Sequence, residues 1–293
     1  MKLESIVTLA SPEVRLRFIA MERSLRATGC NLPLRVIPYN EGRFDLPANA
    51  EWWEDIEMSE WLKSRGAHPA MRKCQCLTIA NFQFVDADVI FLRNPAEILK
   101  PLDGFVTSCG HWRNTGHTVT RQSWPIFASM STMWQKWVFN SGQWASDRIL
   151  HTRESIYECC ESKFKETCLT YNNCDQPGIN LLVISSGVPV HNLTLPPWNM
   201  ESTWAGDYLG SNFESYWGDV DRKPYLLHWA GCAMDKRRPI DGLMERFLNP
   251  DELKAWRSDV ESCARSSVSG ILRSIPWRLY RAIRCFKMSL FSE

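Results

Sequence analysis

The stretch Phe82-Gln83-Phe84-Val85-Asp86-Ala87-Asp88-Val89-Ile90-Phe91 decides the fold. It is mostly apolar, and its aromatic and β-branched residues favour a buried strand. Asn94-Pro95 follows and ends the strand, because proline has no N–H to donate to a sheet. Residues two apart on a strand project to the same side, so Asp86 and Asp88 are predicted to share one side of this strand.

The segments before this strand alternate between strand and helix signals. Ser11-Pro12 is typical of a helix start, and Gly29 is typical of a helix end. Strands are predicted at 5–9, 34–39, 181–184 and 225–229, and helices at 12–28, 55–65, 68–81 and 250–264. This alternation predicts an α/β fold with a largely parallel sheet and helices on both faces.

The bulk composition indicates a folded protein. With 293 residues, 44% of them hydrophobic and 23% charged, the chain can bury a sizeable core. A net charge of +1 argues against a nucleic-acid partner. No signal peptide or membrane span is recognisable, which predicts a cytoplasmic protein with reduced thiols. The spacing of Cys159, Cys160, Cys168 and Cys174 is not that of a zinc site.

The C-terminal end differs from the rest in charge. Residues 265–293 hold six basic side chains and one acidic side chain. Apolar residues recur three or four apart from Leu272 to Leu290, which predicts a basic amphipathic helix. Residues 1–265 are therefore expected to form the main domain and residues 266–293 a tail. The tail either binds an anionic membrane surface through residues 271–291, at the inner face of a membrane, or packs on the domain.

The two carboxylates of the central strand indicate a metal site. They repel each other unless a cation lies between them, and the carboxyl end of a parallel strand is a common ligand crevice. Mn²⁺ or Mg²⁺ suits such oxygen ligands and bridges to phosphates. One alternative is a pair of solvated acids at a strand end. Another is a phosphatase of the haloacid dehalogenase type with Asp86 as the nucleophile, although those enzymes place the motif on the first strand and Asp219 and Asp221 are poor second partners.

Four segments occur in one order: FVDADVIF (84–91), FNSGQW (139–144), DQPGIN (175–180) and LHWAG (227–231). Together they resemble retaining glycosyltransferases of the GT-A fold, notably family 8 and related family 77-like enzymes. The resemblance covers about Ile6 to Lys236. It implies a Rossmann-like mixed, mostly parallel sheet within a catalytic domain at 1–265. It also implies metal-dependent transfer of a sugar from a nucleotide donor, expected to be a UDP-sugar, to a glycan or glycolipid with retention.

The resemblance also implies roles for residues. His228 would complete the metal site with Asp86 and Asp88, and the expected catalytic residues are Asn140, Asp175 and Gln176. The residues expected to contact the nucleotide donor are Thr8, Ala10, Arg72, Lys73, Asp86, Ala87, Ser141, Gly142, Gly231 and Lys236. The family usually has a lysine six residues after the metal histidine, where this chain has Met234, so Lys236 or Arg237 is expected to substitute.

Ordinary structural roles remain open for several of these residues. His228 could be a packed histidine, Gly142 part of a simple turn, and Asp175 an acid favoured by a helix dipole. A third reading of the whole chain is a non-catalytic protein that binds a nucleotide sugar. In the enzyme reading, no carboxylate is clearly placed as a covalent nucleophile, which favours attack of the acceptor on the same face as the leaving group.

Overall fold

The structure is a computed structural model, and it describes residues 1–113, 115–170, 175–219, 221–232 and 237–263. The predicted tail at 266–293 and Lys236 lie outside these described residues. Within them, no helix is long and apolar enough to cross a membrane.

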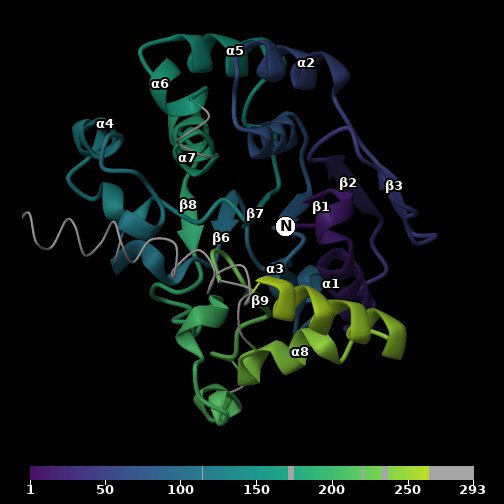
Figure 1. Cartoon of the computed structure of the whole chain (residues 1–293). Helices are drawn as coiled ribbons and strands as arrows, with labels where there is room; N and C mark the ends of the chain where they lie inside the picture. Colours follow the sequence, from purple (N-terminus) through teal and green to yellow (C-terminus); the bar gives the residue numbers. More distant parts are fainter. Residues whose placement is uncertain (114, 171–174, 220, 233–236, 264–293) are drawn as a thin grey trace, which may run out of the picture.

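Seven strands form the central sheet in the spatial order β3-β2-β1-β4-β7-β6-β8 (Figure 1). They are β1 (Ser5–Ala10), β2 (Leu34–Pro38), β3 (Ala50–Trp52), β4 (Phe82–Asp86), β6 (Phe105–Thr107), β7 (Gln143–Ser146) and β8 (Val190–Asn192). The pairs among β3, β2, β1 and β4 are parallel, β7 is antiparallel to β4 and β6, and β8 is parallel to β6. The sheet is thus mixed and mostly parallel, as predicted. A separate antiparallel pair joins β5 (Val89–Phe91) to β9 (Leu226–His228).

Helices connect and cover these strands. The α-helices are α1 (Arg15–Ala27), α2 (Ile56–Ser64), α3 (Pro95–Leu99), α4 (Trp124–Met130), α5 (Arg153–Glu161), α6 (Lys165–Cys168), α7 (Gln176–Ser185) and α8 (Gly242–Glu245). Residues 250–263 are also helical, which confirms the helix predicted after Asn249. The 3-10 helices include η1 (Pro12–Val14), which leads into α1, and η2 (Pro69–Thr78), which precedes β4. Gly29 follows α1 with a φ of +82°, the conformation expected of a glycine at a helix end.

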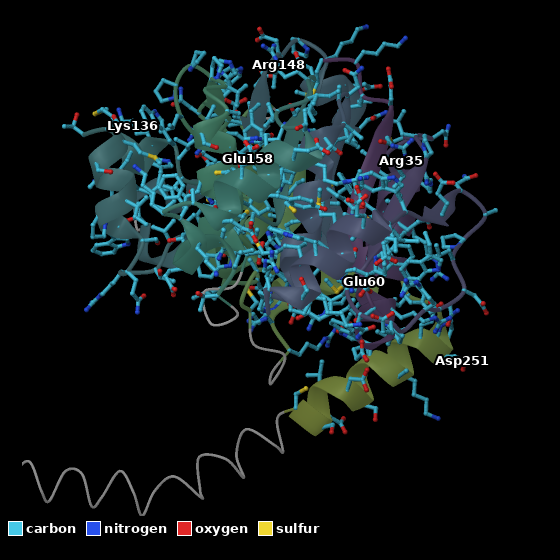
Figure 2. The ribbon with its side chains drawn as sticks, turned by 90° about the horizontal axis from the view of Figure 1, so that it is seen from above. Arg35, Glu60, Lys136, Arg148, Glu158 and Asp251 are labelled. Carbon is cyan, nitrogen blue, oxygen red and sulfur yellow. The ribbon has the colours of Figure 1, made fainter. Side chains whose placement is uncertain are left out.

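The core lies on both faces of the sheet. Side chains alternate along a strand, so Val7 and Leu9 of β1 enter one hydrophobic cluster while Ile6 and Ala10 enter another. The first cluster includes residues of α2, η2, α5 and α7, and the second includes residues of α1 and α3. Charged side chains such as Glu60, Lys136 and Asp251 lie on the outside (Figure 2). Helices on both faces are therefore confirmed.

Three local predictions were wrong. The run 82–91 is not one strand: β4 ends at Asp86, a turn follows, and β5 begins at Val89 in a different sheet. The helix predicted at 68–81 is the 3-10 helix η2. The strand predicted at 181–184 lies inside α7, because a short, fully buried apolar run reads the same in a strand and in a helix.

Candidate metal centre and adjoining pocket

The turn between β4 and β5 positions the two aspartates. Asp86 is the last residue of β4, and its N–H donates to the Gly142 carbonyl at 2.8 Å. Val89 then pairs with His228 of β9. The backbone carbonyl of Asp88 accepts from Trp229 N–H at 3.0 Å, so both sides of the turn are held by hydrogen bonds. Asp86 and Asp88 converge because the chain turns, and not because they share one strand.

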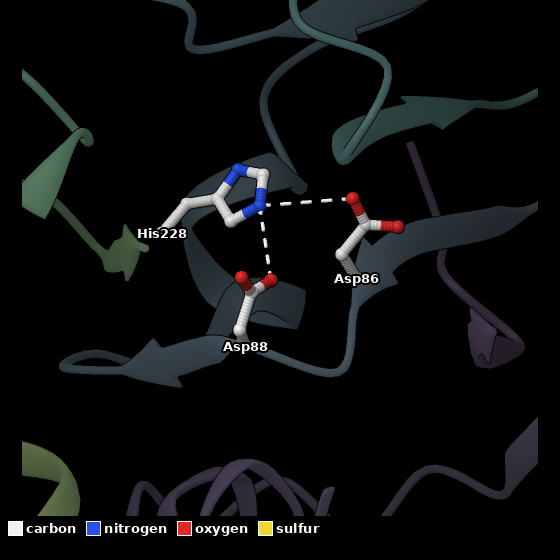
Figure 3. A group of neighbouring side chains, drawn as sticks. All are labelled: Asp86, Asp88 and His228. Carbon is white, nitrogen blue, oxygen red and sulfur yellow. Dashed lines mark ion pairs between the residues drawn. The ribbon is translucent and has the colours of Figure 1, made fainter. Parts of the chain in front are cut away.

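These pairings bring together the three predicted metal ligands, Asp86, Asp88 and His228 (Figure 3). The Nε2 atom of His228 lies 3.1 Å from Asp88 Oδ1 and 3.6 Å from Asp86 Oδ2. One ligand atom from each residue lies within 4.8 Å of the other two, which is close enough for all three to bind one ion. We call these three residues the metal cluster. Two carboxylates and an imidazole suit Mn²⁺ and Mg²⁺ and are also compatible with Zn²⁺.

Gly142 leaves room for this cluster. A Cβ atom at this position would overlap His228 Cε1 and Asp86 Oδ2 and would come within 2.9 Å of Asn140 Oδ1. Any larger residue would therefore displace two of the three ligands. The glycine in the segment 140–142 is thus required by the cluster itself, which goes beyond the ordinary turn that the sequence also allowed.

The three residues of the metal cluster influence one another's pKa values. Burial disfavours protonation of His228, but the carboxylates of Asp88 and Asp86 together outweigh it and raise the pKa of His228. Burial likewise disfavours ionisation of Asp88, but His228 and Arg17, with a backbone hydrogen bond, outweigh it and lower the pKa of Asp88. Burial is the largest influence on Asp86 and raises its pKa, although Lys73 and His228 partly offset it. A metal ion bound here would release the proton from His228.

A second group of buried charges lies on the other side of Asp86. Lys73 Nζ contacts Asp86 Oδ1 at 3.1 Å and Asp175 Oδ2 at 2.9 Å, and the side chain of Lys73 is only 2% exposed. Ser141 Oγ donates to Asp175 Oδ2. Burial opposes both charges, but their mutual attraction raises the pKa of Lys73 and lowers that of Asp175. We call Lys73, Asp175 and Ser141 the lysine centre.

Asn180 holds the segment that joins these two groups. Its side chain accepts from Phe139 N–H at 2.9 Å and donates to the carbonyls of Phe139 and Gln176, both at 2.8 Å. Asn180 is fully buried and belongs to the DQPGIN segment, but no functional role was predicted for it. Through these hydrogen bonds, Asn180 on α7 positions residues 140–142.

A pocket of about 360 Å³ opens beside the metal cluster. It lies at the carboxyl ends of β1, β2 and β4. Its lining residues are Leu9, Ala10, Ser11, Glu13, Val14, Arg17, Tyr39, Asn40, Asp86, Ala87 and Asp88. The predicted residues Ala10, Asp86 and Ala87 are among them. Arg17, Tyr39 and Asn40 also line the pocket but were not predicted. Their neighbours in the sequence do not indicate that α1 and the end of β2 lie beside Asp88.

Other predicted residues lie elsewhere. Thr8 is fully buried and does not line the pocket. Arg72 turns to the Pro38 carbonyl at 2.9 Å and to Glu54 at 3.0 Å. Gly231 is exposed, with a φ of +62°. Gln176 begins α7, and its Oε1 atom is buried without a hydrogen-bond donor among the described residues.

Comparison with known proteins bears on the fold. No protein-family model and no curated protein sequence matches this chain. The crystal structure of the galactosyltransferase LgtC, in complex with donor and acceptor sugar analogues, matches with a TM-score of 0.55 and 15% identity, over 86% of this chain and 99% of LgtC. The apo structure of WbbM, a bifunctional glycosyltransferase, matches with a TM-score of 0.54 and 12% identity, over 87% of this chain and 51% of WbbM.

At these identities the likeness concerns the fold. Each match covers more than four fifths of this chain. The chain therefore has the GT-A fold, which it shares with the glycosyltransferases LgtC and WbbM.

Proposed function

We propose that the protein is a metal-dependent glycosyltransferase that moves a hexose or pentose from a UDP-sugar to a glycan or glycolipid with retention of configuration. The observation that carries this proposal is the metal cluster. Two carboxylates from one turn and a histidine 140 residues later in the sequence converge beside a pocket at the carboxyl ends of parallel strands. In α/β sheets this edge is where nucleotides commonly bind.

The residues present fit a divalent ion. Their ligand atoms are close enough to share one ion, and Gly142 keeps the space around Asp86 and His228 free of a side chain. When bound, Mn²⁺ or Mg²⁺ supplies Lewis-acid stabilisation of the leaving nucleoside diphosphate. Asp86, Asp88 and His228 would hold the ion, and the adjoining pocket would hold the nucleoside.

The lysine centre has a different task in this proposal. Asp175 remains ionised because Lys73 and Ser141 hold its charge, so it acts as a fixed negative group and not as a proton carrier. A fixed carboxylate beside the donor sugar stabilises the positive charge that develops at the anomeric carbon. Gln176 follows it, and its unpaired Oε1 is available to accept a hydrogen bond from a sugar or acceptor hydroxyl.

We expect retention to occur by attack of the acceptor on the leaving-group face, without a covalent intermediate. The carboxylate of Asp175 is committed to Lys73 and Ser141, which makes it a poor covalent nucleophile. We therefore expect the acceptor to attack directly. NMR of the product would contradict this part of the proposal by showing inverted anomeric configuration.

The two alternatives predict different outcomes. A phosphatase of the haloacid dehalogenase type would use Asp86 as a nucleophile, but here Asp86 lies between Lys73 and His228, and the fold is GT-A. A non-catalytic protein would bind a nucleotide sugar without turnover. Incubation with UDP-sugars and Mn²⁺ distinguishes this case, because only an enzyme releases UDP.

The first experiment is calorimetric titration of UDP and GDP into the protein, with and without Mn²⁺. We expect UDP to bind only with Mn²⁺, and Asp88→Ala to abolish that binding. Asp219→Ala is the matched control, because Asp219 is exposed, does not belong to the metal cluster and does not line the pocket. Absence of binding by either nucleotide with Mn²⁺ present would remove the basis of the proposal.

For the acceptor we propose a glycan carried on an anionic membrane. The support is the basic, amphipathic sequence of residues 271–291. Deletion of residues 266–293 is expected to abolish cosedimentation with anionic liposomes and to leave UDP binding unchanged. Equal liposome binding by the full and shortened chains would contradict this acceptor.

A further inference from the structure

Arg17 lies in the first turn of α1 and lines the pocket. Its Nη1 atom is 3.7 Å from Asp88 Oδ2, and its side chain is 27% exposed. That distance allows attraction but is too long for a hydrogen bond. Within the described part of the chain, the Arg17 guanidinium donates no hydrogen bond, so its N–H donors remain available to a ligand in the pocket.

The charge of the pocket makes this cation conspicuous. Among the described residues that line it, Glu13, Asp86 and Asp88 are acidic and Arg17 alone is basic. A nucleoside diphosphate is itself an anion and cannot approach three carboxylates without cations to offset them. One such cation is the metal ion, and Arg17 is the other among the described residues that line the pocket.

Among the described basic residues expected to contact the donor, Arg72 and Lys73 are both engaged elsewhere, and Lys236 lies outside the described residues. Lys73 is buried between Asp86 and Asp175, and Arg72 is bound to Glu54 and the Pro38 carbonyl. Neither lines the pocket. Arg17 therefore has the position and the free donors that Arg72 and Lys73 lack.

We propose that Arg17 is a donor-binding residue that holds the diphosphate of the nucleotide beside the metal cluster. The planar guanidinium can donate two parallel hydrogen bonds to phosphate oxygens, a geometry that lysine cannot reproduce. Its distance from Asp88 places it next to any phosphate that bridges to an ion on that aspartate. This inference rests on the proposed function, since it assigns a residue to the same donor site.

The test compares Arg17→Gln and Arg17→Lys with the wild type by calorimetry, using Mn²⁺ alone, then UDP with Mn²⁺, then uridine with Mn²⁺. Arg17→Gln is expected to weaken UDP binding roughly tenfold to a hundredfold, because a charged hydrogen bond is lost. Uridine binding should be unchanged, since uridine has no phosphate. Mn²⁺ binding should be unchanged or tighter, because a cation near Asp88 has been removed. Arg17→Lys should restore only part of the affinity for UDP.

Arg15→Gln is the matched control, since Arg15 is exposed on the same helix and does not line the pocket. It should bind UDP like the wild type. If Arg17→Gln loses Mn²⁺ and UDP affinity in parallel, Arg17 merely orients Asp88 and the inference is overturned. Unchanged UDP affinity in Arg17→Gln overturns it as well, while the proposed function stands. A wild-type protein that binds neither UDP nor GDP with Mn²⁺ overturns both.

Discussion

The metal cluster and the lysine centre adjoin at Asp86, which belongs to the metal cluster and contacts Lys73. The two groups differ in how their charges are balanced. In the lysine centre, the buried cation of Lys73 lies between two carboxylates and Ser141 adds a hydrogen bond, so the group is satisfied within the protein. The metal cluster has two carboxylates and one histidine. Asp86 shares the cation of Lys73 with Asp175, and Asp88 has Arg17 at 3.7 Å, beyond hydrogen-bond distance. A group that is balanced internally stabilises the fold, whereas one that lacks positive charge and borders a pocket is suited to bind a cation.

The largest expected effect comes from removal of the lysine. Lys73→Met leaves the buried Asp175 and the partly exposed Asp86 without their cation, which should lower the free energy of unfolding by roughly 3–5 kcal/mol. Urea denaturation measures this change. The double variant Lys73→Met/Asp175→Asn should be less destabilised than Lys73→Met, because one of the unpaired charges is gone.

Lys63→Met is the control for this loss, because Lys63 is an exposed lysine of α2 that pairs only with surface acids. It should change the free energy of unfolding by less than about 0.5 kcal/mol. A Lys73→Met protein as stable as the wild type would show that the lysine centre does not stabilise the fold, and the contrast with the metal cluster would fail.

A smaller effect is expected from crowding the metal cluster. Gly142→Ala adds a methyl group that must push His228 and Asp86 apart, so Mn²⁺ affinity should fall roughly 10- to 100-fold. Calorimetry with Mn²⁺ measures it. Gly218→Ala is the control, since a Cβ there would lie 3.7 Å from its nearest neighbour among the described residues, the Ser215 carbonyl. Wild-type affinity in Gly142→Ala would mean that the ion does not need the observed positions of these ligands.

The smallest expected effect is that of pH on metal affinity. His228 must lose its proton to bind a metal, and Asp88 raises the pKa of His228 in the metal-free protein. Protons therefore compete more strongly as the pH falls, and Mn²⁺ affinity should drop about tenfold between pH 8 and pH 6. Calorimetry in two buffers of different ionisation enthalpy should show proton release on binding.

His191→Gln should keep this pH dependence, because His191 is a partly exposed histidine of β8 outside the cluster. Affinity that stays constant from pH 8 to pH 6, with no proton released, would exclude His228 as a ligand. The metal cluster would then consist of the two aspartates alone.

Local signals predicted much of this protein. The apolar strands at 5–9, 34–39 and 225–229 were confirmed, because buried strands need continuous apolar residues and those residues are visible in order. The sequence also predicts Asp86, Asp88 and His228 as metal ligands, through segments that resemble known glycosyltransferases, and the structure brings these three residues together. The turn at Ala87 and Asp88 was missed, since an apolar run on both sides hides a change of sheet.

The remaining features depend on residues that are far apart in the chain. By itself the sequence determined the α/β class, the order of the main strands and helices, and the two carboxylates at and just after the end of β4, because each follows from neighbouring residues. Only the tertiary structure decided that Lys73 is buried against Asp175, that Arg72 turns away to Glu54, and that Arg17 enters the pocket. These ion pairs depend on tertiary packing, because each joins residues that are far apart in the sequence.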